Sequence, residues 1–271
     1  DAGDELFGGY NRYLLANKYY KYFRFTPFIL RSNLSRLFKL LPSSLAMGLI
    51  NTIISTDFSG NKENNLSKIL NKALYIKDKK SFYTSMINEW TKEDKIMDFK
   101  EEVNNYHFLE CFDSKKETKL EETMMKADFN SYLPDDILCK VDRSSMFYSL
   151  ETRAPFLNRE VIDFAFNLPL NMKIRNGESK WILKQLLSKY LPRELFDRPK
   201  QGFGIPVSKW MRGELKDWVN ETLSDEALNQ HNLFNKSVVS KVKEDHFKGL
   251  SNNEHKLWSL LQFNQWYDSN K

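Results

Sequence analysis

This sequence has few residues that could form disulfides or bind soft metals. Its 271 residues include two cysteines and four histidines. Cys111 and Cys139 form no C-x-x-C pair, and two thiols in a chain of this length do not make a disulfide framework. The histidines show no spacing typical of zinc ligands. The composition therefore excludes a disulfide-rich scaffold and argues against structural zinc.

Long apolar runs are also missing. No run approaches the ~18 to 20 residues that cross a bilayer, and the first residues are acidic where a secretory signal would be basic. We therefore expect no membrane partner and a cytoplasmic protein. Hydrophobic residues make up 41% of the chain, enough for one large domain or two small ones. Without repeats or runs of alternating β-branched residues, the chain is predicted to be mainly α-helical.

Acidic residues are absent from residues 6–56, which carry only basic charges. Such a patch could face nucleic acid or an anionic surface. Aromatic and leucine residues alternate with the basic ones at near-helical spacing, which favours the solvated face of packing helices and predicts no nucleic-acid partner. The basic residues are Arg12, Lys18, Lys21, Arg24, Arg31, Arg36 and Lys39.

Residues 1–10, Asp-Ala-Gly-Asp-Glu-Leu-Phe-Gly-Gly-Tyr, have the opposite character. The carboxylates of Asp1, Asp4 and Glu5 would repel one another unless a cation lay among them, and Mg²⁺ prefers oxygen ligands. Three glycines, Gly3, Gly8 and Gly9, lack a Cβ and let a backbone or ligand approach closely. The alternative is an acidic helix N-terminus followed by a Gly-Gly turn. We take this stretch as the acidic pole of a candidate active site.

Helical spacing accounts for most of the chain. Residues 10–25 predict a helix that ends before Pro27. Leucine spacing predicts packing helices within residues 30–53 and 66–74, and Phe82, Met86 and Trp90 predict another. Residues 98–120 are the most polar part of the middle and are predicted to be a variable linker. Residues 207–271 are predicted to form closing helices, with a start signal at Ser224 and an apolar face at residues 257–261.

A charged helix is predicted after Leu133. Pro134 suits a first helical turn, and the acids that follow it complement the positive end of the helix dipole. Asp136, Lys140 and Arg143 lie at i, i+4 and i+7, on one face of this helix. This face, with Asp142 beside it, could line a polar cleft or form ion pairs within itself, and the sequence leaves both interpretations open.

Residues 150–157, Leu-Glu-Thr-Arg-Ala-Pro-Phe-Leu, place Glu151 and Arg153 among apolar residues, where charges are buried only when paired. These two side chains either line a site or brace the turn at Pro155. Asn158 is predicted to cap the next helix. The predicted buried face of that helix is Val161, Ile162, Ala165 and Phe166.

Two further segments follow before the closing helices. Residues 177–191 predict an amphipathic helix ended by Pro192. Its apolar residues are Ile182, Leu183, Leu186, Leu187, Tyr190 and Leu191. Residues 197–206 then combine prolines, glycines and cations in a stretch too irregular for a helix or a central strand. Lys200, in this shaped loop, is either a positioned cation or an ordinary surface lysine.

Four blocks of this sequence resemble, in order, the synthetase domain of the glutamine-hydrolysing asparagine synthetases. The blocks are residues 1–10, 133–143, 150–157 and 198–203, and the likeness extends from residue 1 to about Gly213. Separated blocks in the family's order are more specific than any single motif. The resemblance implies the helical C-terminal part of an α/β adenine-nucleotide α-hydrolase-like (pyrophosphate-loop) synthetase domain, whose parallel sheet lies mostly upstream of this chain.

The resemblance also implies a ligase reaction. ATP and Mg²⁺ would convert aspartate to β-aspartyl-adenylate, and ammonia from glutamine would complete asparagine. Lys200 would stabilise the adenylation transition state, and Asp4, with Asp1, would hold Mg²⁺–pyrophosphate. Lys200 and Asp4 should then lie within roughly 10 Å of each other across a bound phosphate. The resemblance also implies catalytic roles for Asp1, Glu5 and Glu151, and contacts of Gly3 and Arg153 with ATP or pyrophosphate. Asp136, Asp142 and Arg143 are secondary candidates.

Two features of the family do not occur in these 271 residues. One is the glutaminase domain with its N-terminal cysteine, and the other is the S-G-G-x-D-S phosphate loop. We therefore expect the chain to need both segments and to be inactive alone, and a homodimer is one candidate assembly. Two alternatives stay open: an amidotransferase or β-lactam synthetase-like enzyme that acts on another carboxylate, and a non-catalytic helical binding module.

Overall fold

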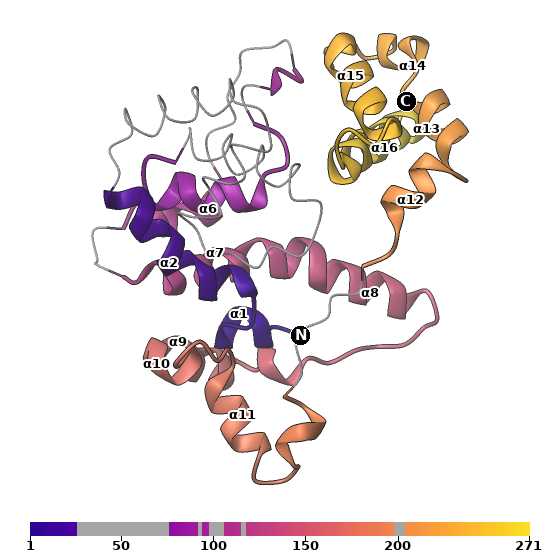
Figure 1. Ribbon diagram of the computed structural model, residues 1–271. Coiled ribbons are helices and arrows are strands. Elements are labelled where there is room, and N and C mark those ends of the chain that lie inside the picture. The colour runs from indigo at the N-terminus through magenta and orange to yellow at the C-terminus, as the bar shows by residue number, and fades with distance from the viewer. Residues whose placement is uncertain (26–75, 92–93, 98–105, 115–117, 198–203) are drawn as a thin grey trace. The chain divides into compact units, whose positions relative to one another are not determined.

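The computed structural model describes residues 1–25, 76–91, 94–97, 106–114, 118–197 and 204–271 (Figure 1). Within these ranges the chain is mostly helical and contains no strand, apart from isolated bridges between Met97 and Phe234 and between Arg175 and Glu178. The prediction of a mainly α chain is confirmed. The helices predicted within residues 30–53 and 66–74 lie outside the described residues, as does Lys200.

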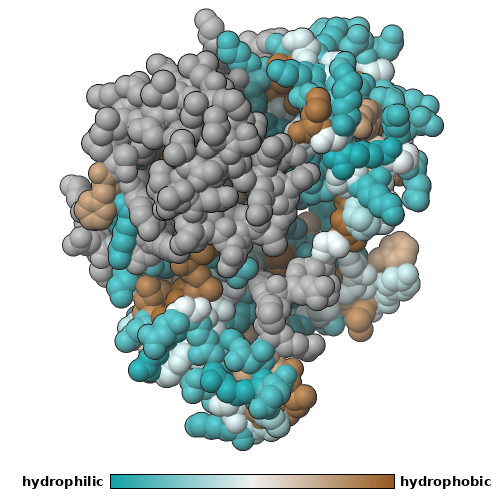
Figure 2. Space-filling view, in the orientation of Figure 1, coloured by the Kyte–Doolittle hydropathy of each residue, from teal (hydrophilic) through white to brown (hydrophobic). Residues whose placement is uncertain are grey.

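The chain divides into two compact units. Unit 1 is Asp1–Leu30, Ile76–Met86 and Val103–Lys200, and unit 2 is Arg31–Tyr75, Ile87–Glu102 and Gln201–Lys271. No helix in the described ranges is long and apolar enough to cross a membrane. Over the face seen in Figure 2 the described surface is mostly hydrophilic, with hydrophobic side chains in small separate groups.

The described helices of unit 1 gather around α7, which contacts α1, α2, η2 and η3. α7 buries several apolar side chains together with Asp128, and so forms the centre of the unit. The described helices are α1 (Gly3–Phe7), α2 (Asn11–Phe25), α6 (Lys79–Ile87), η2 (His107–Phe112), α7 (Leu120–Asn130), η3 (Leu133–Leu138), α8 (Cys139–Met146), η4 (Pro155–Leu157), α9 (Arg159–Asn167), α10 (Leu170–Lys173), α11 (Trp181–Leu187) and η5 (Arg193–Leu195).

A small apolar cluster fixes the acidic turn of α1 to the rest of unit 1. Ala2, Leu6 and Phe7 are buried against Leu133 of η3 and Ala165 of α9. Gly8 ends α1 with a φ of 72°, and a Cβ there would lie 2.7 Å from the Ile174 side chain. Glycine is therefore required at this turn, because other residues would be strained both by the backbone and by the contact.

The predicted start of α9 is confirmed, because the Asn158 side chain accepts a hydrogen bond from the Glu160 N–H (2.9 Å). α2 is described as far as Phe25, and the residues after it lie outside the described ranges, so its end before Pro27 stays a prediction. The helix predicted from Leu133 is present in two parts, a π-helix (η3) followed by α8. In the segment predicted as a linker, residues 107–112 form a 3₁₀ helix that buries Leu109.

Three predicted apolar faces were wrong in part. α6 ends at Ile87, so Trp90 lies beyond it. Phe166 of α9 is 41% exposed. Of the residues assigned to the α11 face, Ile182 and Leu183 pack against the cluster around α1, whereas the more C-terminal ones are exposed. The spacing identified the hydrophobic face of a helix but not whether another element packs on it, because periodicity carries no information about neighbouring elements. The exposed residues of that face are Leu186, Leu187, Tyr190 and Leu191.

The described C-terminal part of unit 2 is a bundle of short helices closed by α16. Ser224 caps α14 by accepting a hydrogen bond from the Ala227 N–H (3.2 Å), as predicted. The predicted face of α16 is buried, at Leu257, Leu260 and Leu261, while Trp90 packs against the same core. The helices are α12 (Val207–Arg212), α13 (Lys216–Thr222), α14 (Asp225–Asn229), α15 (Lys236–Phe247) and α16 (Glu254–Ser269).

Candidate active site

The acidic turn meets a lysine that the sequence analysis did not assign to the site. Asp4 Oδ1 lies 3.1 Å from Lys180 Nζ, and the two side chains are 25% and 34% exposed. The Lys180 N–H donates to the Phe7 carbonyl (3.2 Å), so the end of α1 fixes the lysine backbone just before α11. A carboxylate and an ammonium group are thus held together where solute can reach both.

Gly9 makes this ion pair possible. A Cβ at residue 9 would overlap both Asp4 Oδ1 and Lys180 Cε. Gly3, the first residue of α1, is buried, and a Cβ there would lie 3.8 Å from Lys180 Nζ and 3.4 Å from the Phe156 ring. The prediction that glycines permit close approach in this stretch therefore has a specific basis at Gly9, where the group that approaches is the ion pair itself.

Glu5 points away from solvent. Its side chain is 2% exposed, and Oε1 accepts a hydrogen bond from the Tyr10 hydroxyl at 2.6 Å. Burial and the hydrogen bond to Glu5 raise the pKa of Tyr10, so the hydroxyl remains a donor. Of the three acids predicted as one cluster, Asp4 pairs with Lys180, Glu5 is buried on Tyr10 and Asp1 is exposed.

A further carboxylate, that of Asp128, lies in α7, the helix that also contacts α1. It is fully buried and binds Arg12 and Tyr13 of α2 and Tyr83 of α6. Sequence reasoning missed Asp128, since one acid in an amphipathic helix looks like an ordinary surface residue. The available signal was its place among the apolar residues of α7, because an acid on a buried face must be paired.

The other predicted site residues lie apart from this ion pair's contacts. Glu151 and Arg153 pair with each other (Oε1 to Nη2, 2.5 Å) and are 69% and 84% exposed. Asp136, Asp142 and Arg143 are exposed, and among the residues described no ion pair links the charges of the Asp136 face. The convergence of Lys200 with Asp4 stays a prediction.

A second charged group lies near α11. Glu178 Oε1 accepts from Arg193 Nη2 (2.7 Å) and lies 3.4 Å from Lys184 Nζ, which also pairs with Asp197 (2.9 Å). These pairs hold the irregular segment after α11 against the turn before it. Lys184 is therefore a structural lysine one helical turn from Lys180, with partners of its own.

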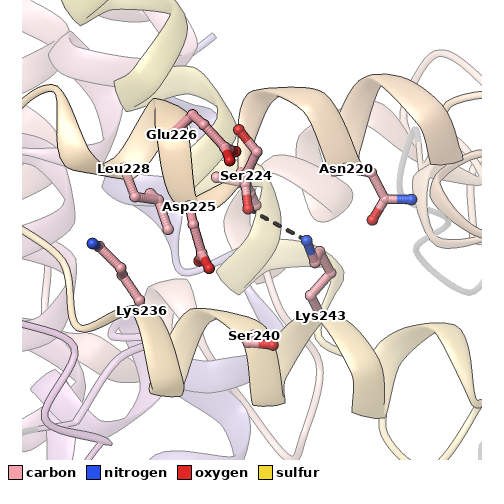
Figure 3. A pocket seen from close by; sticks show the side chains of 9 residues that line it. Asn220, Ser224, Asp225, Glu226, Leu228, Lys236, Ser240 and Lys243 are labelled. Carbon is pink, nitrogen blue, oxygen red and sulfur yellow. Dashed lines mark hydrogen bonds between the residues drawn. The ribbon is translucent and has the colours of Figure 1, made fainter.

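Unit 2 contains a polar pocket of about 270 Å³ between α15 and the α13–α14 segment (Figure 3). Lys236 and Lys243 face Asp225 and Glu226 across it, and Lys243 Nζ donates to the Leu223 carbonyl at 3.3 Å. None of the site residues predicted from the sequence lines this pocket. Its charges balance within the lining and mark no anion site.

A glycine-framed acidic turn that faces a lysine suits an enzyme that handles phosphate groups, because it offers both a metal-binding carboxylate and a cation. The family model for asparagine synthase matches residues 1–268. The chain belongs to the asparagine synthase family. The resemblance of the four sequence blocks is thereby confirmed.

Individual relatives agree with this assignment. Asparagine synthetase [glutamine-hydrolyzing] 1 of Bacillus subtilis is 27% identical over 274 residues, covering 100% of this chain and 40% of the relative. A putative asparagine synthetase [glutamine-hydrolyzing] of Mycobacterium bovis is 34% identical over 145 residues, or 53% of this chain and 22% of the relative. The chain therefore spans well under half the length of these relatives. No solved structure matches it significantly.

Proposed function

We propose that this chain forms part of an ATP-dependent ligase that converts aspartate to asparagine with ammonia from glutamine. The observation that carries the proposal is the Asp4–Lys180 pair on the acidic turn, in a chain whose family model spans residues 1–268. Membership of the family supports the reaction class, and the contact between Asp4 and Lys180 supports a role in handling phosphate.

The reaction has two steps. An aspartate β-carboxylate oxygen bonds to the α-phosphorus of ATP and pyrophosphate leaves; ammonia then bonds to the activated carbonyl carbon, and AMP leaves with the carboxylate oxygen. Negative charge develops on the leaving pyrophosphate in the first step, and a positioned cation lowers that barrier. Lys180 is placed for this role beside Asp4, and we propose Lys200 as a second cation.

Mg²⁺ would neutralise the phosphates in this scheme. The described residues contain no cluster of three or more potential ligands from histidine, cysteine and acids. One partly exposed carboxylate, Asp4, nevertheless fits an ion that arrives with its phosphates, since Mg²⁺ is commonly held by one or two carboxylates, phosphate oxygens and water. We propose Asp4 as its ligand, with Asp1 as a second. Lys180 would then leave its ion pair with Asp4 and pair with a phosphate oxygen.

The other assignments follow the resemblance and remain part of this proposal. Gly3 and Arg153 would contact ATP or pyrophosphate, and Glu151 would act in catalysis. Asp136, Asp142 and Arg143 are secondary candidates. Since the chain matches 40% of the B. subtilis relative, we propose that the glutaminase and the phosphate loop come from further segments of the polypeptide. A cytoplasmic location and a homodimer belong to the same proposal.

Aspartate-dependent exchange of pyrophosphate into ATP tests the first step in the full-length protein that carries this chain. Exchange should require aspartate, and glutamate or β-amino acids should not replace it. Lys180→Met should lower exchange at least tenfold, and Lys180→Arg should restore part of it. Lys184→Met is the matched control, since Lys184 pairs with Glu178 and Asp197 instead. Exchange driven only by another carboxylate would favour the amidotransferase or β-lactam synthetase-like alternative.

A further inference from the structure

Asp128 is anchored by donors from two other helices. Arg12 Nε donates to Oδ2 at 3.0 Å, and Nη2 lies 2.9 Å from Oδ1 as an ion pair without hydrogen-bond geometry. The Tyr13 hydroxyl donates to Oδ2, and the Tyr83 hydroxyl to Oδ1 at 2.7 Å. Burial, and next to it the charge of Asp128, raise the pKa of both tyrosines, so they stay donors. A buried carboxylate with such partners has one stable position.

Arg12 extends this anchor toward the acidic turn. Its Cζ lies 4.5 Å from the centre of the Tyr10 ring and 5.3 Å from that of Tyr132. The two rings pack edge to face with centroids 5.7 Å apart. Because Asp128 holds the guanidinium and the guanidinium faces both rings, the cation–π contacts fix where the Tyr10 ring lies.

Tyr10 in turn holds the turn that carries Asp4. Its hydroxyl donates to the buried Glu5 side chain at 2.6 Å, and Glu5 adjoins Asp4 in α1. The Gly9 N–H donates to the Asp4 carbonyl (2.8 Å), which closes the turn on the other side. A continuous series of contacts thus runs from the centre of α7 to the carboxylate that pairs with Lys180.

We propose that Asp128, Arg12, Tyr10 and Glu5 are positioning residues that hold the Asp4 carboxylate in place. Glu5 acts as the hydrogen-bond acceptor of Tyr10 and does not touch substrate. The role of Asp4 toward phosphate rests on the proposed function, whereas the anchoring of the turn is independent of it. The two parts therefore need separate measurements.

Hydrogen exchange of the ligand-free, full-length protein tests the anchoring. Tyr10→Phe removes only the hydroxyl and keeps the ring beside Arg12. Backbone amides of residues 6–9 should exchange at least tenfold faster in this variant, while those of α7 are unchanged. Tyr83→Phe is the matched control, because it removes a hydroxyl that donates to Asp128 from the α6 side while Arg12 and Tyr13 still hold that carboxylate. It should leave residues 6–9 as protected as in the unchanged protein.

Binding of magnesium pyrophosphate, measured by calorimetry, tests the role of Glu5. Glu5→Gln loses the charge but keeps an oxygen that can accept from Tyr10, whereas Glu5→Ala loses both. Positioning predicts that Glu5→Gln binds within about threefold of the unchanged protein and that Glu5→Ala and Tyr10→Phe bind at least tenfold more weakly. An equal loss in Glu5→Gln and Glu5→Ala would show that the charge matters and would overturn the assignment.

The outcomes separate the two proposals. The positioning inference would be overturned if hydrogen exchange at residues 6–9 were unchanged in Tyr10→Phe, or if Tyr83→Phe accelerated it equally. This holds whether or not the protein binds magnesium pyrophosphate. If the unchanged protein fails to bind magnesium pyrophosphate while Tyr10→Phe alone loosens the turn, the proposed function fails and the anchoring stands. Faster hydrogen exchange at residues 6–9 in Tyr10→Phe, together with weaker binding of magnesium pyrophosphate by Glu5→Ala but not by Glu5→Gln, supports both the positioning inference and the proposed function.

Discussion

The Asp4 carboxylate and the Lys180 ammonium lie 3.1 Å apart, although one belongs to the first helix and the other precedes α11. Two local features produce this contact. The Lys180 N–H is bound by the Phe7 carbonyl, and Gly9 leaves room for both side chains. The ion pair thus depends on the backbone around the Gly-Gly turn as well as on the attraction between the two charges.

Replacing Gly9 with alanine tests that dependence without removing a charge. The new Cβ would overlap Asp4 Oδ1 and Lys180 Cε, so both side chains must move away from their present positions. Binding of magnesium pyrophosphate should weaken at least tenfold, about 1.4 kcal/mol. Gly213→Ala is the control, since the nearest atom to a Cβ there is the Lys209 carbonyl oxygen at 3.4 Å. If Gly9→Ala binds as well as Gly213→Ala, the geometry of the pair has no bearing on phosphate.

Replacing Asp128 should lower the free energy of unfolding strongly. Asp128→Ala leaves the Arg12 charge and two tyrosine hydroxyls without their buried acceptor, and breaking a buried ion pair from one side costs about 3–5 kcal/mol. Tyr83→Phe removes a single hydrogen bond and should cost about 1 kcal/mol. Urea unfolding of both variants measures the difference. Similar losses in the two would mean that Asp128 is not the centre of the network.

A further prediction concerns Lys200, whose proposed role rests on the sequence alone. Lys200→Ala should abolish aspartate-dependent exchange of pyrophosphate into ATP while leaving glutamine hydrolysis intact, because a cation in the site acts on phosphate and not on the glutaminase. Wild-type exchange in this variant would remove Lys200 from the mechanism. Combining it with Lys180→Met would show whether the two lysines act on one step.

Sequence reasoning predicted a mainly helical chain and many of the helices that the structure describes, but not the residues that pair with the acids at its start. Local signals such as the Asn158 cap and the Ser224 cap were sufficient, because capping depends on neighbours a few residues away. Lys180 and Asp128 were missed, because each acquires its meaning from a residue far along the chain. The exposed Tyr190 shows the same limit in reverse, since spacing alone placed it on a buried face.

Because of His246 of α15, we expect the free energy of unfolding to fall in acid. It is fully buried; Nδ1 accepts a hydrogen bond from the Asn253 N–H (3.1 Å), and Nε2 has no hydrogen-bond partner within the described residues. Burial, and after it the nearby charge of Arg212, lower the pKa of His246 below its usual 6.5. The unfolded chain therefore binds the proton more readily. The stabilising contribution is complete above pH 6.5 and is lost as the pH falls below it, with a slope of at most about 1.4 kcal/mol per pH unit.

Thermal unfolding between pH 8 and pH 5 measures this loss. His246→Gln should flatten the fall in Tm below pH 6.5, because the amide does not titrate while its oxygen can still accept from Asn253. His255→Gln is the matched control: that histidine is 68% exposed, and its replacement should leave the fall in place. A fall of equal size in His246→Gln would assign the acid sensitivity to other groups.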